Sequence, residues 1–414
     1  MKRVLMVVFQ FPPFAGSSAV QRTLRFVQQL PKHGWEPIVL TARASAYEST
    51  SADLLRELPA ETIVHRAFAL DAARHLSLAG RYPRFLARPD RWNSWRFAAV
   101  SAGRSLVARY EPAAVWSTYP IATAHLIAHR LAAGGLPWIA DFRDPMAQEG
   151  YPADPSTWKA FKAIEEATVR RARFSVFTTP GAARAYADRY READRDRFCV
   201  IENGFDESSF AGLDDAYEAD GPLVPGRVTI LHTGVVYPQE RDPTQFFAAL
   251  ARLKARGVLD AAHAVVRFRA PGDDRYLAGL AGQFGISDLI EVLPAVPYRE
   301  ALREMCRADG LVVLQGADCN QQIPAKVYEY LRAARPILGL TDPAGDTAGT
   351  LIDAGVTEIA PLNSAGRIEA VLEGWIETIS SSRAVKPDAT RARRNSRTVR
   401  AEELAALLDR AAGL

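Results

Sequence analysis

Residues 321–340 carry the sequence QQIPAKVYEYLRAARPILGL, whose pattern predicts a helix followed by a strand. Pro324 stands where the first turn of the helix would begin, a position that tolerates proline. Apolar side chains then recur at the spacing of one helix face, at Val327, Tyr330, Leu331 and Ala334. The apolar run at 336–340 follows after a very short loop and is typical of a strand. The stretch therefore predicts part of a βαβ unit.

Two charged residues of this stretch, Lys326 and Glu329, lie off the apolar stripe. Because they are three residues apart, they share one polar ridge of the predicted helix. Both lie within about a turn of the helix N-terminus, where backbone N–H groups and the helix dipole attract anions. The pattern therefore predicts a binding site for a nucleotide diphosphate.

Length and composition exclude several classes of protein. The chain has 414 residues, which suggests two or three domains of roughly 100–200 residues each. Its formal net charge of +3 is small for this length and argues against nucleic acid as a partner. The three cysteines are odd in number and lack metal-type spacing, which favours a reducing cytoplasm. No run of about 18 apolar residues occurs, so no membrane-spanning segment is expected.

Apolar runs that resemble strands alternate with helical stretches through the first half of the chain. The runs lie at 4–11, 37–41, 62–68, 113–119, 138–142, 174–179 and 198–201. This alternation predicts an α/β fold with a doubly wound parallel sheet, in which ligands bind beyond the carboxyl ends of the strands. Residues at these ends are expected to converge on one rim, namely Gly16, Tyr119, Asp141, Arg143 and Asp144.

A polar segment at 213–226, rich in glycine and proline towards its end, is the predicted linker. After it the pattern restarts, with strand-like runs at 228–236, 264–270, 289–293, 310–315 and 336–340. The sequence thus predicts two Rossmann-like domains. The first spans 1–212 and is completed by a C-terminal helix at 392–414, and the second spans 227–391.

Five segments resemble, in order, the motifs of GT-B glycosyltransferases, and more narrowly the branch of glycosyltransferase family 4 that contains DFRDP. They are FPPFAGSSAVQRTLRFVQQLPKHGWEPIVLT, PWIADFRDP, VIENGFD, LHTGVVYPQERDP and IPAKVYEYLRAARPIL, and together they cover nearly the whole chain. The resemblance implies two domains that face each other across a cleft, with the acceptor mainly on the first and the donor mainly on the second. It implies a hexosyltransferase-type enzyme that moves a sugar from a nucleotide diphosphate sugar to an acceptor hydroxyl, with retention and without a metal.

The resemblance also implies roles for residues of the second half. Glu329 matches the second glutamate of the family's Glu-x7-Glu motif and would hold the ribose, whereas Gln321 replaces the first glutamate, which contacts the transferred sugar. An amide still forms hydrogen bonds there but carries no charge. Arg241 and Lys326 are the candidates for stabilising the diphosphate as it leaves, and the alternative for both is an ordinary solvated side chain. The donor-side set is completed by Gly16, Gly234, Ile323 and Val327.

On the acceptor side two interpretations stay open. Asp141 or Asp144 orients or deprotonates an acceptor hydroxyl, with Ser17, Tyr119 and Arg143 nearby. Alternatively, the two aspartates and the arginine between them form a turn cap and a structural ion-pair cluster. For Gly16, close backbone approach to a ligand stands beside simple turn formation.

The expected partners are small molecules and a membrane surface. A UDP-sugar is the favoured donor, followed by a GDP-sugar, with no cofactor and no metal, and the acceptor is a lipid-linked or small glycoside. Residues 81–109 combine seven arginines with Trp92, Trp95 and Phe97, a composition that docks on anionic lipid or on an acceptor phosphate. The alternative is a helical excursion whose tryptophans pack inside. The expected location is the cytoplasm, with possible contact to the inner face of the membrane, in polysaccharide or glycoconjugate biosynthesis.

Two other functions fit the same architecture. A nucleotide-sugar 2-epimerase needs additional acid and base groups in the cleft, and the sequence offers few of them. A catalytically degenerate transferase that only binds its ligand is kept open by Gln321. Incubation with the donor alone distinguishes these functions. An epimerised sugar favours the epimerase, and donor hydrolysis above background argues against a subunit that only binds its ligand.

Overall fold

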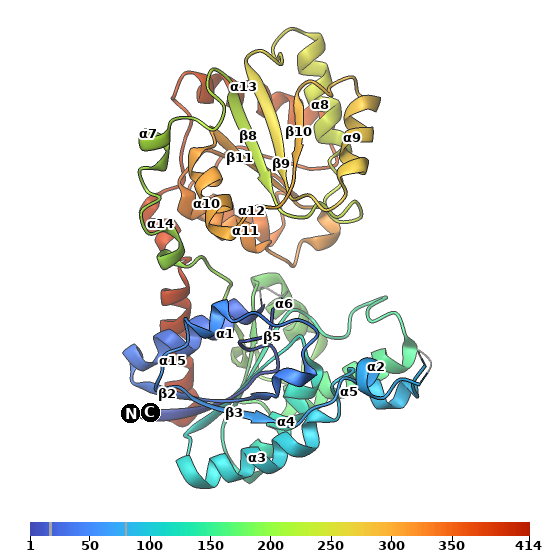
Figure 1. Ribbon diagram of the computed structural model, residues 1–414, viewed down its shortest axis with the longest axis vertical. Coiled ribbons are helices and arrows are strands. Elements are labelled where there is room, and N and C mark those ends of the chain that lie inside the picture. Colours follow the sequence, from blue (N-terminus) through green and yellow to red (C-terminus); the bar gives the residue numbers. More distant parts are fainter. Residues whose placement is uncertain (16–18, 79–80) are drawn as a thin grey trace. The chain divides into compact units, whose positions relative to one another are not determined.

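The computed structural model describes residues 1–15, 19–78 and 81–414. The chain forms two compact units (Figure 1). Unit 1 consists of Met1–Glu202 and Arg397–Leu414, and unit 2 consists of Asn203–Ser396. The predicted linker at 213–226 lies within unit 2, where its short helix α7 (Ala216–Asp220) is held by a hydrogen bond from the Tyr217 hydroxyl to Asp309.

Unit 1 is built on a parallel sheet whose described part has seven strands in the order β3-β2-β1-β4-β5-β6-β7. The strands are β1 (Lys2–Val7), β2 (Trp35–Ala42), β3 (Ile63–Ala67), β4 (Ala114–Thr118), β5 (Trp138–Arg143), β6 (Phe174–Phe177) and β7 (Phe198–Val200). Side chains of β1 alternate between two apolar clusters, with Val4 and Met6 on one face and Leu5 and Val7 on the other. Because both faces are buried from Val4 onward, the strand is apolar from Val4 to Val7.

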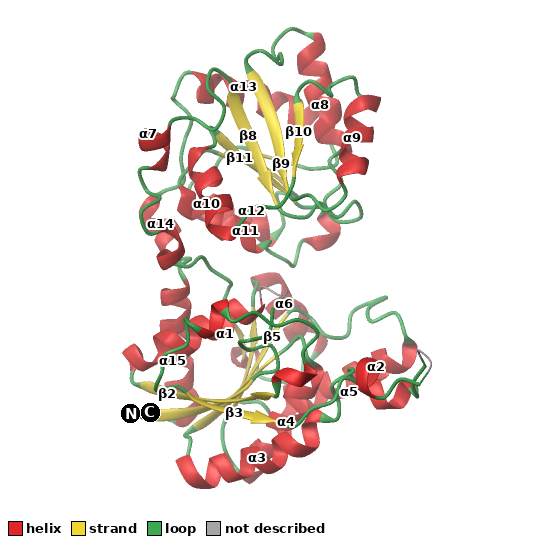
Figure 2. Cartoon of the chain, in the orientation of Figure 1, coloured by secondary structure: helices red, strands yellow, loops and turns green. Residues whose placement is uncertain are grey.

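Helices cover both faces of this sheet (Figure 2). They are α1 (Ala19–Gln29), α2 (Ala72–His75), α3 (Trp95–Tyr110), α4 (Ala122–Leu131), α5 (Pro155–Arg171), α6 (Pro180–Arg189) and α15 (Arg397–Ala412). The last helix returns to unit 1 and packs against α1, so that Leu404 and Leu408 are buried beside Val4 and Met6. Both ends of the chain therefore lie close together in unit 1 (Figure 1).

Unit 2 repeats the architecture with a parallel sheet whose order is β10-β9-β8-β11-β12-β13. Its strands are β8 (Val228–Thr233), β9 (Ala264–Arg269), β10 (Ile290–Leu293), β11 (Gly310–Leu314), β12 (Ile337–Leu340) and β13 (Ile359–Ala360). Its longer helices are α8 (Thr244–Ala255), α9 (Asp274–Gln283), α10 (Tyr298–Arg307), α11 (Ala325–Ala333), α12 (Asp346–Asp353) and α13 (Ala365–Ser380), followed by α14 (Ala389–Arg393). The predicted fold class, two Rossmann-like α/β domains of the GT-B type, is confirmed.

The helix and strand predicted from residues 321–340 are α11 and β12. Helix α11 begins directly after Pro324 and buries Val327, Tyr330 and Leu331, as the spacing predicts. It ends one residue earlier than the apolar stripe suggests, because Ala334 adopts a left-handed conformation with φ of 53°. That residue turns the chain into β12.

Candidate functional site

The carboxyl end of β8 brings the backbone close to a cation. Gly234 follows the strand with φ of 84°, a conformation that favours glycine. A Cβ atom at this position would lie 3.4 Å from the Nζ of Lys326. Glycine thus gives a ligand access to both the turn and the ammonium group of Lys326.

Helix α11 presents its N-terminus at the same edge of the sheet. Pro324 precedes its first residue as the N-cap and provides no side-chain cap to the first turn. Ile323 and Val327 are buried in the apolar cluster beneath the helix, where their side chains fix its position. Lys326 is half-buried near the free end, where backbone N–H groups attract anions.

His232, a buried residue of β8, holds the ammonium group of Lys326. The Nζ of Lys326 lies 3.0 Å from His232 Nε2, and His232 Nδ1 lies 2.9 Å from the carbonyl oxygen of Val312. Nδ1 therefore carries the proton and Nε2 accepts a hydrogen bond from Lys326. Burial, reinforced by Lys326, keeps the pKa of His232 well below its usual range, so the imidazole is neutral.

The pKa of Lys326 is lowered to about 7, chiefly by burial and then by the positive charge of Arg241, while Glu329 opposes the shift. Arg241 lies in the loop after β8 and is oriented by two hydrogen bonds. Its Nε donates to Gln315 Oε1 over 3.4 Å, and its Nη1 donates to the carbonyl oxygen of Val235 over 3.1 Å. Two cations therefore converge at the edge where α11 begins.

Glu329 lies one helical turn beyond Lys326 and is half-buried. The hydroxyl of Tyr298, the first residue of α10, donates a hydrogen bond to Glu329 Oε1 over 2.7 Å. The ring of Tyr298 is 50% exposed. Gln321 is exposed in the loop that precedes α11. The structure thus adds Tyr298 and His232 to the predicted residues of this edge.

In unit 1 the predicted rim residues of β4 and β5 meet at the carboxyl edge of the sheet. The Tyr119 amide donates to the carbonyl oxygen of Asp141 over 3.0 Å, and the Tyr119 ring is buried. The pairing of β5 with β6 shifts register between Asp141 and Arg143, and Arg143 adopts φ of 62°. Such bulges re-aim side chains at the ends of strands. Gly16 and Ser17 lie outside the described residues.

The side chain of Asp141 is fully buried, and both of its carboxylate oxygens accept hydrogen bonds. Its carboxylate accepts hydrogen bonds from Arg22 Nε and Nη2 over 3.1 and 3.2 Å and from the Thr118 hydroxyl over 3.1 Å. Arg22 also donates to the carbonyl oxygens of Ile201 and Glu202. Asp141 therefore joins β4, β5, α1 and the end of unit 1, an arrangement that favours the structural interpretation of this residue.

Asp144 differs from Asp141 because it is exposed. Desolvation by the surrounding protein nevertheless raises its pKa, and the positive charge of Arg143 opposes that shift. A carboxylate with a raised pKa is a stronger base near neutral pH. Asp144 is thus the accessible carboxylate of the DFRDP segment.

A buried carboxylate, Glu165 of α5, fixes the backbone that follows Asp144. It accepts hydrogen bonds from the Ala147 amide over 3.1 Å, from Arg189 Nη1 over 2.9 Å, and from the hydroxyls of Tyr186 and Tyr190. The Met146 amide donates to the Tyr186 hydroxyl over 2.9 Å, and Arg189 donates to the Ala147 carbonyl oxygen over 2.8 Å. Helices α5 and α6 therefore clamp residues 146–147.

Comparison with known proteins agrees with this arrangement. A family model described as a glycosyl transferase 4-like domain matches residues 18–204, which make up most of unit 1. Residues 18–204 are a glycosyl transferase 4-like domain. The chain therefore contains a glycosyl transferase 4-like domain, and its two units have the GT-B fold.

Solved structures with the same fold cover the chain from end to end. Sucrose-phosphate synthase of Thermosynechococcus elongatus is 13% identical, with a TM-score of 0.67 over 99% of both chains. HepE of Anabaena, solved with UDP and glucose, is 12% identical, with a TM-score of 0.65 over 99% of this chain and 100% of that chain. The α,α-trehalose 6-phosphate synthase of Burkholderia multivorans is 15% identical, with a TM-score of 0.65 over 100% and 97%. A search of curated protein sequences finds no match.

Other side chains of unit 1 have definite surroundings. His125 is buried, its Nδ1 lies 2.8 Å from the Ser117 hydroxyl, and burial lowers its pKa to about 3, so this histidine packs inside the unit. Among residues 81–109, Trp95 is fully buried and Trp92 is half-buried, whereas Phe97 is exposed. In the described part of the chain, no helix is long and apolar enough to cross a membrane.

Proposed function

We propose that this protein is a glycosyltransferase that moves a sugar from a nucleotide diphosphate sugar to an acceptor hydroxyl, with retention and without a metal. The observation that carries the proposal is the convergence of Lys326 and Arg241 on the N-terminus of α11, beside the open turn at Gly234. This edge of unit 2 offers two positive charges and backbone N–H groups to one ligand. A diphosphate fits that combination.

The proposed chemistry follows from where charge develops. As the bond between the anomeric carbon and the diphosphate oxygen breaks, negative charge grows on the phosphate oxygens. Lys326 and Arg241 stabilise that charge, in the place that a divalent cation takes in other enzymes. Fixed cations that need no reorganisation during the reaction account for a metal-independent transfer.

Glu329 is the proposed partner of the ribose hydroxyls. Its carboxylate accepts hydrogen bonds from hydroxyl groups, and Tyr298 orients it through the bond to Oε1. The half-exposed ring of Tyr298 offers an apolar surface beside the same carboxylate. Gln321, in the preceding loop, is the proposed contact of the transferred sugar through its amide.

Unit 1 is proposed to bind the acceptor at the rim that Asp144 occupies. Asp144 orients the acceptor hydroxyl and receives its proton as the oxygen bonds to the anomeric carbon. We choose Asp144 over Asp141 because the Asp141 carboxylate is buried against Arg22. Arg143 and Tyr119 flank this position at the ends of β5 and β4.

A UDP-sugar is the first donor to test and a GDP-sugar the second. HepE is described in complex with UDP-glucose, and one trehalose-phosphate synthase of the same fold is described as UDP-forming. Those ligands belong to those proteins, and they support the order of testing here. A lipid-linked or small glycoside is the proposed acceptor.

Calorimetric titration with UDP, GDP and ADP tests the donor site. We expect one diphosphate to bind, and Lys326→Met to weaken that binding at least tenfold. Lys386→Met removes the same charge from an exposed position of unit 2 and serves as the matched control. No binding by any of the three nucleotides, or equal affinity in the two variants, would refute the proposal.

Product analysis tests the reaction itself. Transfer with retained anomeric configuration, unchanged by a chelator, is the expected result with a suitable glycoside acceptor. Donor incubated alone should give only slow hydrolysis. An epimerised sugar under that condition would favour the epimerase, and binding without any turnover would favour a binding subunit.

Peripheral contact with an anionic membrane is part of the proposal. Within residues 81–109, Phe85 and Phe97 are each 67% exposed, and the Arg84 side chain is 83% exposed. Exposed aromatic rings beside arginines suit an anionic lipid interface. Phe85→Ser should reduce co-sedimentation with vesicles that contain phosphatidylglycerol. Leu55→Ser, at another exposed apolar position, should not reduce it; equal binding by both variants would remove this segment from the proposal.

A further inference from the structure

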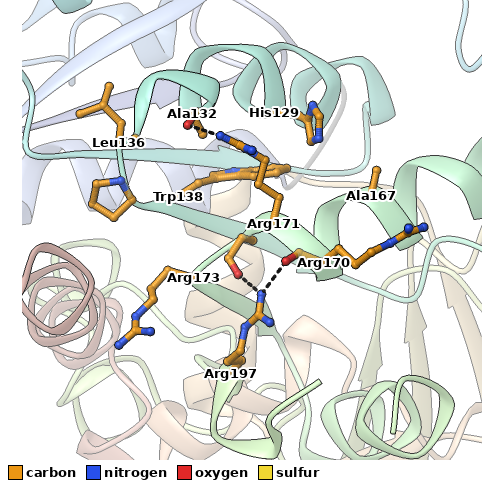
Figure 3. A pocket seen from close by; sticks show the side chains of 12 residues that line it. His129, Ala132, Leu136, Trp138, Ala167, Arg170, Arg171, Arg173 and Arg197 are labelled. Atoms are coloured by element: carbon orange, nitrogen blue, oxygen red, sulfur yellow. Dashed lines mark hydrogen bonds between the residues drawn. The ribbon is translucent and has the colours of Figure 1, made fainter. Parts of the chain in front are cut away.

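A cavity of about 850 Å³ lies at the amino-terminal edge of the unit 1 sheet (Figure 3). Its wall includes Trp138, the first residue of β5, together with the C-terminal ends of α4 and α5 and the segment before β7. The other end of β5 carries Arg143 and leads to Asp144. The cavity is therefore separated from the proposed acceptor rim by the length of a strand.

The charge of this cavity is entirely of one sign. Its lining contains four arginines and a histidine and no acidic residue among the described residues, namely Arg170, Arg171, Arg173, Arg197 and His129. The contrast is a cavity of about 490 Å³ in unit 2, whose lining has four acidic residues and no lysine or arginine, namely Glu240, Asp242, Asp318 and Asp342. The arginine-lined cavity of unit 1 therefore favours anions.

Helix capping explains only part of this charge. Helices α4 and α5 end at the cavity, and each C-terminus carries the equivalent of about half a negative charge. Arg171 donates to the carbonyl oxygen of Ala132 over 2.7 Å, and Arg197 donates to the carbonyl oxygens of Arg170, over 3.3 Å, and of Ala172 (Figure 3). Arg197 also donates to the carbonyl oxygen of Val169 over 2.7 Å. Two helix ends offset about one of the four arginine charges. Glu166 Oε2 lies 3.8 Å from Arg170 Nη2 and offsets part of another, so a positive excess remains.

The same capping bonds prepare two arginines for a ligand. Each uses one terminal nitrogen, Nη2, and the remaining nitrogens of Arg171 and Arg197 have no partner among the described residues. Holding a guanidinium in place before binding reduces the entropy lost when a ligand arrives. Arg170 and Arg173 are exposed and extend on either side of Arg197 (Figure 3).

We propose that this cavity binds a phosphate-bearing ligand at a site separate from the donor site. The planar guanidinium groups of Arg171 and Arg197 can each donate two parallel hydrogen bonds to a pair of phosphate oxygens. Arg170 and Arg173 add further positive charge to offset the charge of the phosphate. Leu136 and Pro137 add an apolar wall on one side. The phosphate belongs either to a soluble phosphorylated compound or to a lipid headgroup, which share the chemistry that the arginines recognise.

The experiment measures phosphate binding with the donor site disabled. In a full-length Arg241→Met/Lys326→Met background, inorganic pyrophosphate is titrated by calorimetry. Vesicles of phosphatidylcholine with and without phosphatidylglycerol are tested by co-sedimentation. The test variant adds Arg170→Gln and Arg173→Gln, whose side chains make no capping bond to the backbone. The control adds Arg56→Gln and Arg191→Gln, which remove equal charge elsewhere on unit 1.

The test variant is expected to lose about tenfold in affinity, as removal of charge-assisted hydrogen bonds to phosphate predicts. The control is expected to stay within about twofold of the background. Loss confined to pyrophosphate identifies a soluble ligand, and loss confined to anionic vesicles identifies a headgroup; both support the site. Absence of binding to either probe, or equal loss in the test and control variants, would overturn it.

Discussion

The ammonium of Lys326 lies between a neutral acceptor, His232, and two charges of opposite sign, Arg241 and Glu329. Its pKa of about 7 follows mainly from burial. A diphosphate that binds here supplies the negative charge that restores the protonated form. Donor binding should therefore be coupled to proton uptake.

This coupling predicts the pH dependence of nucleotide affinity. Below about pH 7 the Lys326 side chain is already protonated, so a further decrease in pH does not raise the affinity for UDP through this group. Above about pH 7 a proton must be taken up on binding, and affinity should fall by up to tenfold per pH unit. UDP affinity should be measured across pH for the wild type and for Lys326→Met, and the two pH profiles should differ by this slope above about pH 7. Comparing the two proteins cancels the titration of UDP itself, which is common to both. Parallel profiles would contradict the assignment.

His232→Leu tests whether the histidine positions Lys326. Loss of the Nε2 acceptor leaves the ammonium with one fewer hydrogen bond, so the pKa of Lys326 should fall further and the loss of affinity should begin at lower pH. At pH 7 we expect UDP to bind about tenfold more weakly.

His263→Leu, at an exposed histidine in the same unit, is the matched control and should leave the pH profile unchanged. A variant that binds weakly at every pH with an unshifted profile would show a merely structural role for His232. The midpoint of the profile therefore separates positioning from folding.

At the scale of elements, α5 and α6 clamp the chain after Asp144 through Glu165. Glu165→Ala removes the shared acceptor of two tyrosines, an arginine and a backbone amide. Unit 1 should lose about 3 kcal/mol of unfolding free energy, because buried donors remain without partners. Thermal melting of the variant measures the loss.

Kinetics give that prediction a second readout. If the clamp positions Asp144, Glu165→Gln should lower kcat for transfer while UDP affinity, which depends on unit 2, stays unchanged. Glu166→Gln, at the neighbouring and more exposed position, should affect neither quantity strongly. A fall in UDP affinity equal to the fall in kcat would contradict a role confined to the rim.

At the scale of the molecule, the last helix of the chain stabilises the first unit. Leu408 of α15 is fully buried in the cluster that covers one face of the unit 1 sheet. Leu408→Ala should cost about 2–5 kcal/mol and lower the melting temperature of unit 1 by several degrees.

Calorimetry can assign this shift to a unit. UDP, which is proposed to bind unit 2, should raise the transition of unit 2. Leu408→Ala should therefore move the other transition, whereas Leu277→Ala, at a buried position of unit 2, should move the one that UDP raises. If Leu408→Ala lowered both transitions equally, the units would not unfold independently.

Local sequence patterns predicted most of the fold. The strand-like runs, the proline before α11 and the spacing of Val327, Tyr330 and Leu331 are local properties, and each matches an observed element. Ala334 departs from the pattern because its backbone turns left-handed, which apolar spacing does not record. Similarly, the segment at 213–226 has the composition of a linker, yet α7 packs against α10 within unit 2.

The sequence alone determined the two Rossmann-like domains and the helix from which Lys326 and Glu329 project. Both follow from the spacing of apolar residues and from the order of strands and helices along the chain, which depend on neighbouring residues only. Only the tertiary structure placed His232, Tyr298 and Arg22 against the predicted residues, since each partner is distant in sequence. The tertiary structure also showed that the two aspartates differ in exposure. Asp144 is exposed, whereas Asp141 is buried and paired with Arg22. Packing decides such pairings because it brings together charges that no sequence spacing relates.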